Sequence, residues 1–211
     1  MKRHLRSIVL LTLVCGAAAA AHAQFRYGPQ LGANFTDMKF KQEIVGVGSG
    51  VGPSAALACE FMFTSFGLGI DFGLGYSMSS ARIDLGEKPI WSLQGYGNER
   101  VLVHNLQIPL HLRFKWTKMQ GLEDYIAPFV YGGPDFNIQV GHSRHRRGDT
   151  SAFRFSGGDV SLTCGFGLEL FKRWQASFGY SWGVTYSLKT RLLDDYSART
   201  NGWNVKVAYF F

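Results

Sequence analysis

The sequence has 211 residues and a formal net charge of +7, with only 18% charged residues and 26 glycines. A chain of this length forms one domain or one small barrel. Its basic residues are dispersed, which argues against nucleic-acid binding, and beyond the N-terminal segment no apolar run approaches the roughly 20 residues of a membrane helix, which excludes a helical membrane protein.

The N-terminal segment has the three parts of a secretory signal peptide. It begins with basic residues, continues through an apolar run from Ile8 to Val14 and reaches the small-residue motif Ala21-His22-Ala23. We expect cleavage after Ala23, so that residues 1–23 are the signal peptide and 24–211 form one exported domain.

Eight segments of the exported part alternate between apolar and polar or small residues, which is the period of a β-strand. In 106–116, LQIPLHLRFKW, every large apolar side chain has one parity, and the other parity carries residues such as His111 and Arg113. In chain order the segments lie near 25–37, 51–63, 67–79, 106–116, 125–140, 160–170, 176–188 and 203–211. Such spacing predicts an all-β fold of eight antiparallel strands.

The two faces of these strands favour a membrane over water. The apolar rows carry no charge, and the opposite rows are dominated by Gly, Ser and Ala rather than by the Lys and Glu of a solvated surface. An Arg or Lys facing lipid at the bilayer midplane would cost about 2–4 kcal/mol. The pattern therefore predicts an eight-stranded transmembrane β-barrel in the bacterial outer membrane.

The connections support this topology because long and short ones alternate. We expect long extracellular loops over 38–50, 80–100, 141–157 and 189–199, and short periplasmic turns over 64–66, 117–124 and 171–173. Three prolines, Pro109, Pro128 and Pro134, lie inside the predicted strands, where each removes a donor from the ladder. We therefore expect a bulge or a strand end near Pro109 or Pro134.

Ionisable side chains on the inward rows are the first candidate site. All fall in the periplasmic half of the barrel, where opposite charges can meet. They are Arg26, Glu60, Asp71, Arg113, Lys115, Glu169 and Lys206. Because eight strands leave an interior just wide enough for side chains, we expect these groups to fill the lumen with charge pairs. The alternative is an ion path or gate.

The predicted loop 141–157 is the most basic segment of the exported chain and is the second candidate site. Arg144, Arg146, Arg147 and Arg154 could bind the phosphates of lipopolysaccharide, or they could belong to a solvated loop. His142 and His145 could ligate a metal, but no matched carboxylate or Cys partner is evident, so no metal and no cofactor are expected.

Hydrolase residue types also occur here, as His142, Ser143 and Asp149. Neighbours on one loop rarely give the rigid geometry of a nucleophile and its base. We therefore expect no enzyme activity.

Four segments of the chain resemble the outer-membrane β-barrel domain common in Bacteroidetes, a porin-like family that includes the PorT-type proteins. They are FRYGPQLGANFT, LQIPLHLRFKW, APFVYGGPDFN and the terminal VKVAYFF. The resemblance implies an eight-stranded barrel whose final aromatic residue is read by the outer-membrane assembly machinery. Phe211 matches that residue, and Tyr209 lies in the same outward row.

From these observations we expect a structural or surface-interaction barrel with a filled lumen. The expected partners are outer-membrane lipid, lipopolysaccharide and the barrel assembly machinery; we expect a monomer and no nucleic acid. The leading alternative is a small-solute porin. An outer-membrane enzyme and a soluble ligand-binding barrel are further alternatives.

Overall fold

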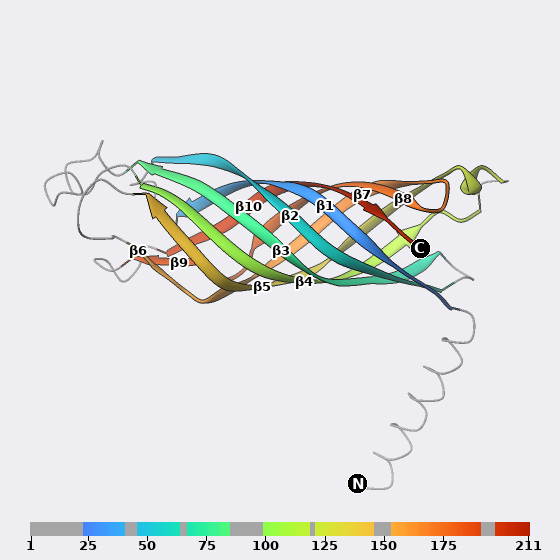
Figure 1. Ribbon diagram of the computed structural model, residues 1–211, viewed down its shortest axis with the longest axis horizontal. Coiled ribbons are helices and arrows are strands. Elements are labelled where there is room, and N and C mark those ends of the chain that lie inside the picture. The colour runs from blue at the N-terminus through green and yellow to red at the C-terminus, as the bar shows by residue number, and fades with distance from the viewer. Residues whose placement is uncertain are drawn as a thin grey trace, which may run out of the picture.

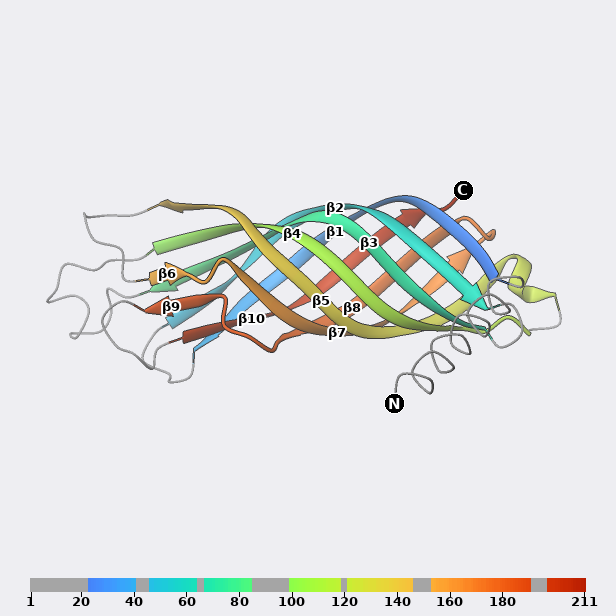
Figure 2. The same ribbon diagram turned by 90° about the horizontal axis from the view of Figure 1, so that it is seen from below.

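A closed antiparallel β-barrel is the architecture of the computed structural model, which describes residues 23–40, 46–63, 67–84, 99–118, 121–145, 153–190 and 197–211. The predicted signal peptide, apart from Ala23, lies outside these residues. Eight long strands form the wall (Figures 1 and 2). They are β1 (Ala23–Phe40), β2 (Gly46–Phe63), β3 (Leu68–Asp84), β4 (Glu99–Lys115), β5 (Ile126–His145), β7 (Gly158–Leu170), β8 (Trp174–Gly183) and β10 (Ser197–Tyr209). The short strands β6 (Phe153–Phe155) and β9 (Leu188–Thr190) and the 3₁₀ helix η1 (Leu122–Asp124) complete the described elements. Among the residues described, no helix is long and apolar enough to cross a membrane.

Pairing of the first and last long strands closes the sheet. β1 pairs with β10 from Gln30–Ala208 to Phe40–Ala198, so no long strand is left with an open edge. The beginning of β1 and the end of β10 lie at the same end of the barrel (Figure 1), the periplasmic end by the usual topology. The fold confirms the predicted eight-stranded transmembrane barrel.

The register also gives the stagger of the barrel, which the sequence could not. Stepping from each residue to its partner on the next strand, one circuit returns to β1 ten residues nearer the N-terminus. The steps are Asn34, Asn204, Gly179, Gly165, Tyr131, Arg113, Gly69, Met62 and Gln24. Partners therefore lie progressively closer to the periplasm on going from β1 through β10, β8 and β7.

The predicted faces are confirmed. Outward residues such as Leu31 and Leu112 are exposed, Leu112 by 71%, whereas Glu60 and Arg113 on the inward rows are buried. Large apolar side chains outside and ionised ones inside reverse the arrangement of a soluble protein. A lipid-facing barrel requires this reversal.

The predicted loop boundaries were wrong at the extracellular end, because the strands extend well into the loops expected over 38–50, 80–100, 141–157 and 189–199. The reason lies in the inward row. Beyond the polar lumen, the inward residues become apolar, for example Ile83 and Val101, and both are buried. The alternation of apolar and polar residues therefore stops there, and the sequence predicts the end of the strand too early.

The predicted strand over 176–188 was wrong at its upper end. β8 ends at Gly183, and the backbone N–H groups of Val184 and Thr185 both donate to the Val160 carbonyl. This bend separates β8 from β9, and Leu188, expected to face outward, is fully buried.

The bulge or strand end expected near Pro109 or Pro134 was wrong, because β4 and β5 run through both prolines without a change of register. The pairing is interrupted there, however. The β3–β4 ladder lapses between Phe72–Leu110 and Gly75–Gln107, and the β4–β5 ladder lapses between Pro109–Asp135 and Leu112–Gly132. Both gaps adjoin Pro109, and the second spans the level of Pro134. Pro128, in contrast, lies within continuous β5–β7 pairing.

Gly28 allows β1 to approach the end of β10 closely, and this leads to a testable prediction. A Cβ on Gly28 would overlap the Tyr209 backbone carbonyl, whereas one on Gly132 would meet the Cys164 Cβ and the Thr163 carbonyl oxygen at 3.5 Å, which are ordinary contacts. We expect Gly28→Ala to lower the free energy of unfolding by about 1–3 kcal/mol, because the seam must move apart. Guanidinium unfolding in lipid vesicles measures this, with Gly132→Ala as the matched control. Equal stability of the two variants would contradict the tight seam.

Candidate functional site in the barrel lumen

The periplasmic half of the lumen is filled by a network centred on Glu60, which is 0% exposed. Its carboxylate accepts from Arg26 Nη2 at 2.5 Å, Arg113 Nη1 at 2.5 Å and Lys115 Nζ at 2.8 Å. Gln175 Nε2 adds a fourth donor at 2.6 Å. These partners come from β1, β4 and β8, so one carboxylate ties together distant parts of the wall.

Glu169 provides a second anionic centre in the same network. It accepts from Arg26 at 2.5 Å, from Lys115 at 2.8 Å and from Gln175 at 2.7 Å. Arg113 also donates to Asp71 through Nε at 2.6 Å, and its guanidinium lies 4.1 Å from the centroid of the Phe129 ring. Three cations therefore face three carboxylates, so the network is electrically balanced as buried charges require.

Six of the seven predicted lumen residues thus converge. The seventh, Lys206, is buried but lies higher, beside a small cavity that it shares with Asp71 and His111. Gln175 was missed because it precedes the predicted strand and is uncharged. Since its amide both donates to Glu60 and accepts from Arg113 at 2.7 Å, it links the two signs of charge.

A second buried polar group lies above the charge network. Asp135 of β5 contacts His111 Nε2 at 3.0 Å and accepts a hydrogen bond from Thr163 Oγ1. Lys206 interacts electrostatically with the same carboxylate. The alternation placed His111 on an inward row but did not assign it to a site, because neither pairing nor burial follows from parity alone.

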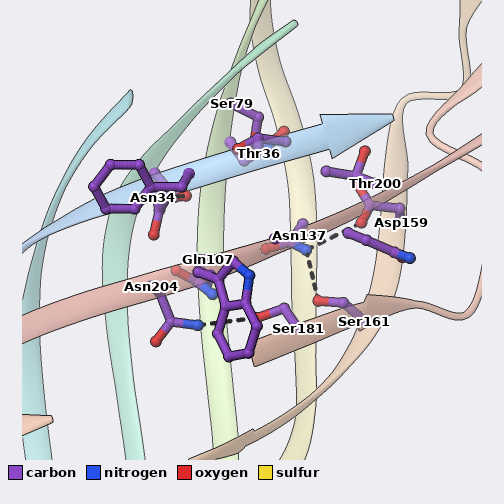
Figure 3. A pocket seen from close by; sticks show the side chains of 16 residues that line it. Asn34, Thr36, Ser79, Gln107, Asn137, Asp159, Ser161, Ser181, Thr200 and Asn204 are labelled. Atoms are coloured by element: carbon purple, nitrogen blue, oxygen red, sulfur yellow. Dashed lines mark hydrogen bonds between the residues drawn. The ribbon is translucent and has the colours of Figure 1, made fainter. Parts of the chain in front are cut away.

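Between this level and the extracellular end is a polar cavity of about 60 Å³ (Figure 3). Hydroxyl and amide side chains from seven strands line it, with hydrogen bonds from Asn137 to Asp159 at 3.1 Å and from Asn204 to Ser181 at 3.2 Å. A space of this size holds only a few water molecules. It is too small for an organic solute.

An apolar cluster lies inside the barrel beyond this cavity, towards the extracellular end. Its members are buried side chains from β1, β3, β4, β9 and β10. They are Met38, Ala81, Ile83, Val101, Val103, Leu188 and Ala198. We call this group the apolar seal. Buried apolar side chains inside a barrel disfavour the passage of water and ions.

The basic segment is split by the structure. Arg144 lies in β5 and Arg154 in β6, while Arg146, Arg147 and Asp149 lie outside the described residues. Arg144 pairs with Val101 and Arg154 with Lys189, so two of the four predicted anion-binding residues belong to strands rather than to a loop. In the described part of the chain, no three His, Cys, Asp or Glu side chains gather as metal ligands would.

The chain end completes the periplasmic rim. The Phe211 N–H donates to the Tyr27 carbonyl at 3.0 Å, and the Phe211 ring lies 5.2 Å from the Tyr209 ring and 5.8 Å from the Tyr27 ring. Phe210 points inward, is buried and lies 5.4 Å beneath the Arg26 guanidinium. The last two residues thus pack on opposite sides of the wall.

Several solved outer-membrane barrels have a similar fold at low sequence identity. A major outer membrane protein from Thermus thermophilus is 14% identical, with 89% of this chain and 100% of that chain covered and a TM-score of 0.55. OprG from Pseudomonas aeruginosa is 12% identical, with 89% and 95% covered and a TM-score of 0.52. The outer membrane enzyme PagL is 13% identical over 85% and 97%, but its TM-score of 0.41 carries no argument about activity. A comparison with curated proteins gives no match.

A family model describes most of the chain. Residues 18–189 match the model of the outer membrane protein beta-barrel domain. With the closed barrel and its reversed faces, this match locates the protein in the bacterial outer membrane and removes the soluble-barrel alternative. The chain belongs to the outer membrane protein beta-barrel domain family.

Proposed function

We propose that the protein is a closed barrel with a structural or surface-interaction role, and that it does not conduct solutes. The observation that carries this proposal is the full burial of Glu60 beneath three cations and Gln175. The apolar seal adds buried side chains towards the opposite end. With both ends of the lumen filled, the outer surface and the extracellular connections are the parts available for interaction.

Within the family, we infer a position among the porin-like, PorT-type barrels of Bacteroidetes. The support is the four segments that resemble that group, including the terminal VKVAYFF. The protein acts as a monomer, since the single chain closes its own barrel. No catalytic step is proposed; Asp149, one of the three candidate hydrolase residues, lies outside the described residues.

A small-solute porin is the second candidate, and the polar cavity lined by Asn34, Asn137 and Asp159 favours it. A conducting path would have to connect this cavity past the charge network and past the apolar seal. Both barriers consist of packed side chains, so the closed barrel is the better supported interpretation.

Single-channel recording in planar bilayers tests the proposal directly. We expect no stable conductance from the purified monomer, because eight-stranded barrels leave no aqueous lumen. A known porin recorded in the same bilayers is the positive control. Reproducible unitary currents from the monomeric protein would establish the porin candidate instead.

A further inference from the structure

Two exposed cations face each other on the outer surface at the extracellular end of the barrel. Lys39 of β1 and Arg199 of β10 are direct cross-strand partners on the outward face. Like charges directly opposite each other in a sheet repel. Within the described part of the chain, no ion pair joins either side chain to a carboxylate. Such a pair is stabilised when an anion binds between its members.

The described residues around the pair include a carboxylate and an aromatic ring. Asp37 lies two residues below Lys39 and is paired with Asn201. The Arg199 guanidinium lies 4.9 Å from the centroid of the Tyr186 ring, which holds this cation at the surface. Below Asp37, the outward pair is Phe35–Trp203. The change from aromatic to polar to cationic residues marks the boundary between the lipid band and the extracellular side.

An apolar groove of about 550 Å³ opens on the lipid-facing surface of β7, β8 and β10. Phe166, Phe178, Tyr180, Trp182 and Trp203 form its walls, and the small Cys164 leaves space between them. The rings support one another: Phe178 and Trp203 stack at 5.1 Å, and Tyr180 meets Trp203 edge-on at 4.6 Å. The volume is in the range of ligand-binding pockets.

The stagger of the barrel places the cation pair above this groove. Trp203 pairs with Tyr180, and Tyr180 pairs with Cys164, so these three lie on one line that descends towards β7. Because of the tilt, each strand also shifts sideways, from β10 towards β7, as it rises to the extracellular end. Arg199, four residues above Trp203 on β10, therefore lies over Cys164 and about 15 Å nearer the extracellular end, for strands about 4.8 Å apart that rise about 3.3 Å per residue at a tilt of about 40°.

We propose that the Lys39–Arg199 pair and the groove form one binding site for a phosphate-bearing lipid of the outer leaflet. The phosphate lies between the two cations, and an acyl chain occupies the groove beside Cys164. The groove is continuous with the surface that already contacts lipid, so acyl chains are its natural occupants. The site lies outside the barrel, so it does not depend on whether the lumen conducts.

Native mass spectrometry of the folded protein in detergent, titrated with diphosphorylated lipid A, tests the site. Lys39→Gln/Arg199→Gln should weaken binding by about thirtyfold, because two basic contacts to an anionic lipid are lost. The double variant should not change the binding of dephosphorylated lipid A. Asp37→Asn should strengthen binding of the phosphorylated form, because it removes the carboxylate beside the cations.

Filling the groove gives an independent test. Cys164→Trp should weaken binding of both forms of lipid A, whereas Leu31→Trp, at another exposed outward position, should not. Heat-modifiable mobility on gels verifies that each variant is folded.

Arg82 and Arg100 are also exposed cationic cross-strand partners, and they provide the matched control for charge. Below it the outward face carries the contact between the Tyr76 hydroxyl and His104, at 2.6 Å, rather than the groove. Arg82→Gln/Arg100→Gln should therefore change affinity by less than about threefold, as a screened surface contribution does. The proposal would be overturned by an equal loss of affinity in both double variants or by unchanged binding in Cys164→Trp. A protein dimer that Cys164→Trp dissociates would also overturn it, because the groove would then be a contact between two copies of the protein.

Discussion

Replacing Glu60 by Gln should lower the free energy of unfolding by about 3–5 kcal/mol, because it leaves buried cations without their shared carboxylate. Glu60 lies within 2.8 Å of Arg26, Arg113 and Lys115, and it is 0% exposed. Gln keeps the shape of the side chain and one acceptor oxygen, so the loss reports the charge rather than a cavity. Guanidinium unfolding in lipid vesicles provides the measurement.

Two further variants separate this effect from a general loss of ion pairs. Asp124→Asn removes one member of an exposed pair, 2.6 Å from Lys172, and should leave the stability nearly unchanged because solvent screens that pair. The double variant Glu60→Gln/Lys115→Met restores the balance of charge, so we expect it to be more stable than the sum of the two single effects. A Glu60→Gln barrel as stable as the Asp124→Asn barrel would show that the network does not need its central anion.

The sequence predicted the faces of the strands because membrane and lumen impose opposite demands on alternate residues. Leu112 and Arg113 show this: the first faces lipid and is 71% exposed, and the second is buried in the lumen. The alternation also assigned to the inward rows six ionisable residues that meet in the lumen. It could not tell that Lys206 lies at a different height from Glu60, because height within a barrel depends on the stagger between strands.

In the extracellular third of the barrel, the alternation did not predict which side chains face inward. Ile83 and Val101 are apolar and face inward there, so the alternation that identified the strands no longer distinguishes lumen from lipid. Leu188 was assigned to the wrong face because the bend after Gly183 is set by hydrogen bonds to Val160 from another strand. The groove at Cys164 likewise depends on how side chains of three paired strands, β7, β8 and β10, pack beside one another, which alternation alone does not predict.

The other large effect is expected at the C-terminus, where deletion of Phe210 and Phe211 should sharply reduce the amount of barrel in the membrane. Two backbone hydrogen bonds are lost, from Phe210 to the Arg173 carbonyl and from Phe211 to the Tyr27 carbonyl. The second of these closes the seam between β10 and β1. The open edge left behind would expose polar backbone groups to lipid.

Two interpretations of Phe211 lead to different results for the milder variant Phe211→Ala. If Phe211 and Tyr209 form the signal read by the assembly machinery, chains fail before insertion and are degraded, so membrane yield falls while the folded remainder keeps its stability. If Phe211 is only an interfacial anchor, 70% exposed at the periplasmic rim, yield is normal and stability falls slightly. We expect the first result.

Trp174→Ala provides the matched control for the anchor interpretation, because Trp174 is also exposed at the periplasmic rim and its ring contacts Tyr209 at 5.0 Å. Membrane-fraction yield and heat-modifiable mobility are measured for both variants from the same expression level. An anchor predicts that the two variants behave alike, since both remove one aromatic ring from the same girdle. An assembly signal predicts that only Phe211→Ala loses yield, because Trp174 lies within the chain and not at its end. Normal yield of folded Phe211→Ala barrel would therefore reject the assembly role and leave the terminal aromatic row as an anchor.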